Sequence, residues 1–192
     1  MGKIVISENM SLDGVVQDPT GEEGLRHGGW VTQIGNRDRE AWAKFGRDEA
    51  LAAEALLLGR RSYEFLAARW PSRTGQWADR LNSMPKYVVS STLEDPIWNN
   101  STMLKGDVVN EASKLKQELT GEIVVAASFQ LVHTLIEHDL VDELRLLIYP
   151  FVLGASERLF GKTSDKKSIR LIDTKIVGDG LAFLSYELVR DA

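Results

Sequence analysis

Cysteine is absent from the 192-residue sequence, which excludes disulfide bonds, cysteine nucleophiles and thiolate ligands for a metal ion. An excess of positive charge is also missing, because 23 lysines and arginines face 28 aspartates and glutamates, a net charge of −5. Proteins that bind nucleic acid usually carry a basic surplus, so a nucleic-acid partner is not expected. The three histidines, His27, His133 and His138, are scattered and predict no metal site.

Long hydrophobic runs are absent as well. No apolar segment approaches the roughly 20 residues that a membrane-spanning helix needs. The apolar run at residues 4–6 is too short for a signal peptide, so we expect no membrane association and a cytoplasmic location. The hydrophobic fraction of 43% and the charged fraction of 27% are typical of a globular domain. At this length, residues 1–192 are expected to form one domain.

Apolar, β-branched runs alternate with segments of helical period along the chain. Strands are predicted at residues 4–6, 55–58, 86–90, 102–104, 123–126 and 144–149. Helices are predicted from Asp38 onward and at residues 62–68, 110–119 and 129–138, with Asn110 as an amino-terminal cap. Gly178-Asp179-Gly180 forms a hairpin turn between strands at 169–177 and 181–189. This order predicts an α/β layer fold with a mostly parallel sheet and an antiparallel carboxy-terminal hairpin.

One strand end has the features of a phosphate site. The strand at 55–58 ends at Gly59, and a helix with Arg60, Arg61 and Ser62 near its start follows at once. Free N–H groups at the amino end of a helix attract anions, and the two arginines add positive charge in an acidic protein. Ordinary helix capping with solvated arginines explains the same residues, so both interpretations stay open.

Two further strand ends carry small or hydroxyl side chains. Ser90, Ser91 and Thr92 end the strand at 86–90, where they can bind phosphate or ribose, or form a Ser/Thr turn. Ala127 and Ser128 lie between a strand and a helix, either near a bound phosphate or as a tight connection capped by Ser128. Ligands of open parallel sheets bind at the carboxyl ends of the strands, so all three segments are expected along one edge.

Carboxylates supply the candidates for proton chemistry. Asp13 lies in Ser11-Leu12-Asp13-Gly14, at the start of a long loop predicted over 11–35 and at the same sheet edge. It can hydrogen-bond a substrate or orient a proton donor, or it can form an Asx turn. Asp48 and Glu49 lie on the first long helix, and one of the two is a candidate to face the cleft.

Five motifs, taken in order, resemble the dihydrofolate reductase-like superfamily. Within it, the chain is most similar to the reductase domain at the carboxyl end of the riboflavin-biosynthesis deaminase–reductases (RibD). The motifs lie at residues 11–14, 57–64, 87–92, 140–144 and 150–160, so the resemblance covers essentially the whole chain. It implies a three-layer αβα fold of dihydrofolate reductase type, NADPH as the cofactor, and a homodimer.

The resemblance also assigns site residues. It places the pyrophosphate and 2′-phosphate of the cofactor on two segments, Gly59, Arg60, Arg61 and Ser62, and Ser90, Ser91 and Thr92. The turn at Ala127, Ser128 and Phe129 completes the cofactor site, although the family usually has Gly-Gly or Gly-Ser at the first two positions. Asp13 borders the nicotinamide and substrate and is the candidate catalytic residue. Ala43 falls near the position of the catalytic carboxylate of true dihydrofolate reductases, so folate reduction is not expected.

These observations favour an NADPH-dependent reductase of a small heterocycle, a pteridine or pyrimidine such as a 5-amino-6-(5-phosphoribosylamino)uracil-type compound. A non-catalytic protein that binds a nucleotide or pterin-like ligand on the same fold is the alternative. A serine hydrolase based on Ser128 is disfavoured, because no histidine follows His138. An interaction module is a further interpretation, since five tryptophans, with Trp30, Trp70 and Trp77 near loops or helix ends, can line a pocket or a dimer surface.

Overall fold

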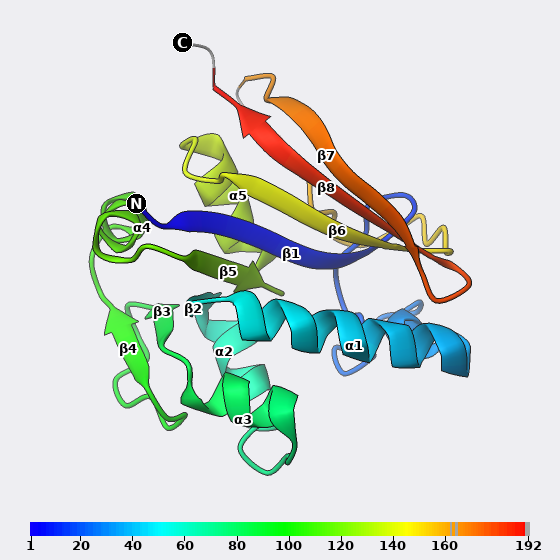
Figure 1. The fold of residues 1–192 in the computed structure, drawn as a ribbon, viewed down its shortest axis with the longest axis horizontal. Helices are drawn as coiled ribbons and strands as arrows, with labels where there is room; N and C mark the ends of the chain where they lie inside the picture. Colours follow the sequence, from blue (N-terminus) through cyan, green and yellow to red (C-terminus); the bar gives the residue numbers. More distant parts are fainter. Residues whose placement is uncertain (162, 164, 191–192) are drawn as a thin grey trace.

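The computed structural model describes residues 1–161, 163 and 165–190, and these residues contain one eight-stranded sheet (Figure 1). The strands are β1 (Lys3–Ser11), β2 (Ala55–Gly59), β3 (Lys86–Val89), β4 (Ser101–Leu104), β5 (Glu122–Ala126), β6 (Glu143–Tyr149), β7 (Ser168–Val177) and β8 (Leu181–Val189). The helices are α1 (Asn36–Ala52), α2 (Arg60–Ala67), α3 (Gln76–Ser83), α4 (Val108–Glu118), α5 (Phe129–Glu137) and the 3-10 turn η1 (Trp30–Thr32).

The strand order is β4-β3-β2-β5-β1-β6-β8-β7. All pairs from β4 to β6 are parallel, whereas β8 runs antiparallel to both β6 and β7. The predicted mostly parallel sheet with an antiparallel carboxy-terminal hairpin is therefore confirmed. Figure 1 shows this hairpin at one end of the sheet and β4 at the other.

Helices cover both faces of the sheet. The side chains of α1, α2 and α3 pack with Val5, Leu58 and Val124 on one face. Those of α4 and α5 pack with Ile6 and Val125 on the other. A central parallel strand that is covered on both sides needs apolar residues at consecutive positions. This need explains the uninterrupted apolar run at the centre of β2.

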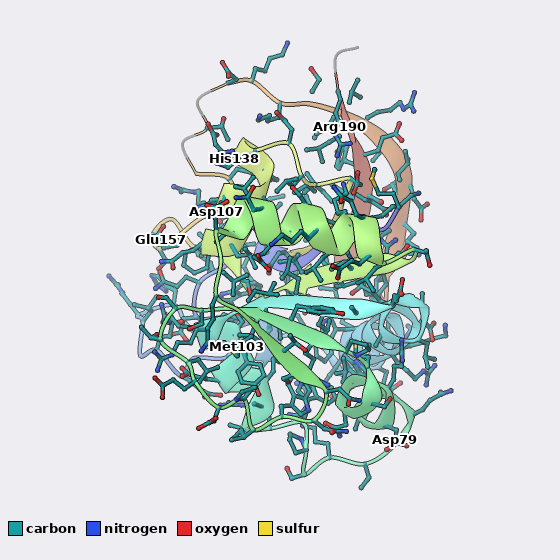
Figure 2. All side chains as sticks on the ribbon, turned by 90° about the vertical axis from the view of Figure 1, so that its left-hand side faces the viewer. Asp79, Met103, Asp107, His138, Glu157 and Arg190 are labelled. Carbon is teal, nitrogen blue, oxygen red and sulfur yellow. The ribbon has the colours of Figure 1, made fainter. Side chains whose placement is uncertain are left out.

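Some boundaries differ from the sequence prediction. Helix α3 was not predicted; it has only eight residues, of which Trp77, Ala78 and Leu81 are apolar. Helix α4 is capped by Asp107, whose carboxylate accepts the Asn110 N–H at 3.0 Å, so the prediction of Asn110 as the cap was wrong. Figure 2 shows Asp107 where the chain enters this helix. Within the described part of the chain, no helix is long and apolar enough to cross a membrane.

Candidate functional site

Two cavities adjoin the carboxyl edge of the parallel strands. The first, here called the amino-end cavity, has a volume of about 560 Å³ and lies at the amino ends of α2 and α5. Its lining includes seven of the predicted cofactor residues: Gly59, Arg60, Arg61, Ser62, Ala127, Ser128 and Phe129. The structure thus brings two strand ends that are far apart in the sequence to one cavity.

Direct hydrogen bonds join the two helix starts. The Gly59 N–H donates to Ser128 Oγ at 3.1 Å, and that hydroxyl donates to the Ala126 carbonyl at 3.0 Å. The Ser62 hydroxyl donates to the Ala127 carbonyl. Ser128 and Ser62 therefore fix the walls of the amino-end cavity, and both hydroxyls are already hydrogen-bonded to backbone groups.

Ala127 has a backbone φ of +53°, in the left-handed region that glycine adopts most easily. The turn between β5 and α5 therefore keeps the geometry of a glycine turn although an alanine occupies it. A non-glycine residue in this region stores conformational strain, of the kind that clusters at binding sites.

The two arginines have different partners. Arg60 donates to Glu64 Oε1 at 2.8 Å and to the Thr92 hydroxyl, so it connects α2 with the end of β3. Arg61 pairs with Glu23 Oε1 at 3.2 Å, and its side chain is 68% exposed. Both guanidinium groups lie at the rim of the amino-end cavity, where a phosphate can recruit them.

The hydroxyl segment after β3 forms a turn. Ser90 Oγ accepts the N–H groups of Thr92 at 3.2 Å and of Leu93 at 3.0 Å, which is the Ser/Thr turn considered from the sequence. Ser91 is exposed. Neither cavity includes Ser90, Ser91 or Thr92 in its lining, but the preceding residue, Val89, lines the amino-end cavity, and Arg60 of that cavity donates to Thr92.

The second cavity, here called the aromatic cavity, has a volume of about 450 Å³ and is enclosed by the sheet and by α1, α2 and α3. Four tryptophans line it: Trp42, Trp70, Trp77 and Trp98. Trp77 contacts both Trp42 and Trp70, with ring centroids 5.5 and 4.9 Å apart. The fifth, Trp30, is buried against Tyr149 and contributes to the core instead.

The two cavities share part of their lining, including Ala127, Phe129 and the loop residues Asp18 to Glu23 except Gly21. Asp18 shapes this loop by accepting the N–H groups of Glu23 and Leu25. A ligand that spans both cavities would pass between this loop and the β5–α5 turn.

Polar side chains of three elements meet in the aromatic cavity. Ser7 on β1 donates to Glu49 Oε2 at 2.7 Å, and Arg145 on β6 lies 3.6 Å from the other carboxylate oxygen of Glu49. That oxygen, Oε1, is buried and has no hydrogen-bond partner within the described part of the chain. Burial raises the pKa of Glu49, while Ser7 and Arg145 lower it. Of the two acids considered on α1, Glu49 is the one that faces the cleft, since Asp48 pairs with Lys44.

Glu8 is a second acid of this cavity, and it was not predicted. The residue is only 8% exposed, and its Oε1 is buried with no hydrogen-bond partner among the residues that the structure describes. Burial raises the pKa of Glu8 to about 8. The nearby charge of Glu49 raises this pKa slightly further, whereas the backbone N–H groups of Ser128 and Ala127 lower it. Glu8 is therefore neutral near pH 7.

Asp13 accepts hydrogen bonds that hold two segments of the chain together. Its carboxylate accepts the Ser11 hydroxyl at 2.7 Å and the N–H groups of Leu153 at 3.0 Å and Gly154 at 2.8 Å. Burial acts to raise the pKa of Asp13, but these hydrogen bonds hold it at about 2. The ionised group joins the end of β1 to the segment after β6 and has no proton to donate near neutral pH. Asp13 is not part of the lining of either cavity.

The family is decided by a match over nearly the whole chain. The model of the RibD C-terminal domain matches residues 2–183. The chain belongs to the RibD C-terminal domain family. The chain is also similar in sequence to two proteins of Bacillus subtilis strain 168 that are named as uncharacterised. YyaP is 27% identical over 138 residues, 69% of this chain and 73% of YyaP. YwjB is 23% identical over 179 residues, 93% of this chain and 94% of YwjB.

Solved structures confirm the fold expected of a RibD C-terminal domain. A pyrimidine reductase-like protein from Corynebacterium diphtheriae has a TM-score of 0.67 at 14% identity, over 98% of this chain and 92% of its own. RibD of Acinetobacter baumannii has a TM-score of 0.63 at 14% identity, over 99% of this chain and 59% of its own. Dihydrofolate reductase of Enterococcus faecalis, solved with NADP(H), has a TM-score of 0.57 at 12% identity, over 97% of this chain and 96% of its own. The predicted dihydrofolate reductase-like fold is therefore confirmed.

Within this RibD C-terminal domain, one sequence signal could have revealed Glu8. Ser7, Glu8 and Asn9 form a polar triplet inside a strand whose neighbours on both sides are parallel strands. Such a strand is normally apolar throughout, and a charged residue within it is rarely buried without a reason. Trp70 and Trp77 line the aromatic cavity, as one interpretation of the sequence expected, whereas Trp30 does not, and no sequence signal showed that Trp42 and Trp98 would join them.

Proposed function

We propose that this RibD C-terminal domain is an NADPH-dependent reductase of a small heterocycle, pyrimidine- or pteridine-like. The observation that carries the proposal is the hydrogen bond from Gly59 to Ser128, which sets the amino ends of α2 and α5 side by side next to the aromatic cavity. Two helix starts with free N–H groups suit the phosphates of a dinucleotide. Arg60 and Arg61 at the cavity rim suit its 2′-phosphate.

The residues present fit such a cofactor. The aromatic cavity, with a volume of about 450 Å³, is lined by the four tryptophans and by Glu49. When bound, NADPH supplies the hydride. The chain's own residues would orient the heterocycle: the tryptophan rings by stacking, and Glu49 by accepting an N–H donor. Asp13 would support the site by fixing the loop after β1, rather than by donating a proton.

The proposal extends to assembly and location. β7 is an edge strand on which Ile169, Leu171, Ile172 and Ile176 are exposed. An exposed apolar edge strand pairs readily with another chain, so we propose that two copies form a homodimer through β7. The cytoplasmic location stays a prediction from the sequence.

Titration with NADPH and NADH, followed by tryptophan fluorescence, tests the cofactor. Trp42, Trp70, Trp77 and Trp98 line the cavity next to the proposed site, so they are suitable reporters. We expect NADPH to bind at least tenfold more tightly than NADH, and Arg61→Ala to reduce this preference. The control is Arg37→Ala, which removes an exposed arginine that pairs with Asp179 on the β7–β8 turn.

Substrate is tested by NADPH oxidation in the presence of pyrimidines and pteridines. Oxidation that depends on one of them supports the reductase. NADPH binding without oxidation by any member of the panel would favour the alternative, a ligand-binding protein on the same fold. Binding of neither cofactor would overturn the proposal.

A further inference from the structure

Asn9 on β1 lines the aromatic cavity with an amide whose orientation is fixed. Its Oδ1 accepts the indole N–H of Trp42 at 3.1 Å. An indole N–H can only donate, so the amide has to turn its oxygen toward Trp42 and its NH2 group away from it. This contact therefore decides which end of the amide is oxygen and which is nitrogen, a choice that the shape of an asparagine side chain leaves open.

The NH2 group of Asn9 is available to a ligand. Among the residues that the structure describes, the contact with Trp42 is the one hydrogen bond of the Asn9 side chain. Nδ2 is also not one of the side-chain atoms that are buried without a partner, so solvent reaches it. Most buried polar groups of a native protein are paired, whereas a half-buried amide with an open donor in a cavity is suited to bind a ligand.

Asn9 lies where the sheet opens into the cavity. β5 pairs with β1 only as far as Ser7, which is opposite Ala126, whereas β6 continues beside β1 past Asn9. Asn9 is therefore two residues beyond the end of β5. Because Ala127, the residue after β5, lines both cavities, Asn9 is close to the place where the two cavities meet. The proposed function has the cofactor and the heterocycle meet in this region.

The same face of β1 carries an acceptor beside this donor. Ser7 and Asn9 are two positions apart, so their side chains lie on one face of the strand. Ser7 donates to Glu49 Oε2 at 2.7 Å and thereby holds the carboxylate over this face. A flat ring stacked against Trp42 would turn its edge toward β1. An edge with an acceptor for Asn9 and a donor for Glu49 is that of a lactam, in which a ring C=O is adjacent to an N–H.

We propose that Asn9 is a specificity-determining residue, which donates a hydrogen bond from Nδ2 to a ring carbonyl oxygen of the heterocycle. The inference rests on the proposed function and narrows its substrate class to rings with an oxo group at this edge. An amino group in place of the oxo group would set two donors against each other. The Asn9 amide cannot turn over to accept it, because its NH2 group would then face the indole N–H of Trp42.

The experiment compares rings that differ in one exocyclic group. Pterin has an oxo group where 2,4-diaminopteridine has an amino group, and uracil and cytosine are the corresponding pyrimidine pair. Each ring is titrated into the protein by calorimetry, with and without NADP+, so that no hydride transfer takes place. We expect the wild type to bind the oxo member of at least one pair about two- to tenfold more tightly, the range of one neutral hydrogen bond.

Two variants separate ligand recognition from support of Trp42. Asn9→Asp keeps an oxygen for the indole N–H but replaces the NH2 group with an acceptor, so the preference should shift toward the amino ring. Asn9→Ala removes the donor without adding a charge, so the preference should disappear. Its result decides the question if the aspartate variant does not fold. Asn110→Asp makes the same amide-to-acid change at an exposed position that lines neither cavity, and it should keep the wild-type preference.

The outcomes separate this inference from the proposed function. A wild type without preference for the oxo rings, or an equal preference in the wild type and both Asn9 variants, overturns the role of Asn9 and leaves the reductase proposal intact. Binding of none of the four rings, with or without NADP+, overturns the inference together with the heterocycle part of the proposed function. The titration with NADPH and NADH decides the cofactor part separately.

Discussion

The hydroxyl of Ser128 accepts the backbone N–H of Gly59 at 3.1 Å, across 69 positions of sequence. The same hydroxyl donates to the Ala126 carbonyl, so one side chain connects the end of β2 with the end of β5. This contact holds the amino ends of α2 and α5, which form the candidate phosphate site, next to each other.

Replacement of Ser128 by alanine should therefore affect both stability and binding. The partly buried Gly59 N–H loses its acceptor, which should lower the free energy of unfolding by about 1–2 kcal/mol. NADPH affinity should fall several-fold as the two helix starts separate. Urea unfolding and fluorescence titration measure the two effects, with Ser83→Ala as the control because Ser83 is exposed and lines neither cavity. Equal stability of Ser128→Ala and the wild type would contradict the assigned contact.

Ala127→Gly should stabilise the protein, in contrast to most glycine substitutions. Alanine at φ +53° carries a cost of about 1 kcal/mol that glycine does not, partly offset by the greater flexibility of glycine in the unfolded chain. We expect a net gain of about 0.5 kcal/mol in urea unfolding. Ala126→Gly, one residue earlier within β5, should instead lose about 0.5–1 kcal/mol. A loss at both positions would mean that Ala127 is not strained.

The order of strands and helices could be predicted because it depends on local patterns. Apolar runs located β2 and β5, and the glycine turn located the hairpin of β7 and β8. The amino-end cavity followed from the same logic, since parallel strands end along one edge. Trp70 and Trp77 were candidates to line a pocket, but the full aromatic cavity could not be predicted, because Trp42 and Trp98 come from separate segments that only tertiary packing brings to them.

The environments of the acidic residues also could not be predicted from local sequence patterns. The helical period alone could not decide between Asp48 and Glu49, which are adjacent and differ by about 100° around α1. The position of the helix over β1 decides it, because Ser7 donates to Glu49. The environment of Asp13 depends on Leu153 and Gly154, about 140 residues away in the chain, and no local pattern predicts such a contact.

Glu23→Gln should increase NADPH affinity. Glu23 neutralises Arg61 at 3.2 Å, and a phosphate has to compete with this carboxylate for the guanidinium. Exposed ion pairs contribute about 0.2–1 kcal/mol, which corresponds to a Kd lower by a factor of about 1.4 to 5 for the variant. Glu22→Gln is the matched control, because Glu22 is adjacent to Glu23 in the sequence but pairs with Arg69 instead of Arg61. Identical effects of both variants would show that only net charge matters.

The stability of the protein should fall with pH through Glu8. Because its pKa is about 8 when folded and near 4.5 when unfolded, the folded state binds the extra proton between these values. The stabilisation is complete below pH 4.5 and lost as pH rises through 8. Glu8→Gln lacks this effect, so its stability relative to the wild type should improve by about 3–5 kcal/mol from pH 5 to 9. Urea unfolding at both pH values measures the difference, and a constant difference would contradict the neutral acid.

Disruption of β7 should separate the proposed homodimer. Ile176 is 76% exposed on this edge strand, and a lysine there places a charge where a second copy would bury an apolar side chain. We expect light scattering with size-exclusion chromatography to give twice the chain mass of 21.4 kDa for the wild type and the single mass for Ile176→Lys. Ile97→Lys changes an equally exposed isoleucine outside the sheet and should remain dimeric. A monomeric wild type would contradict the dimer, whereas dissociation by both variants would place the interface elsewhere than β7.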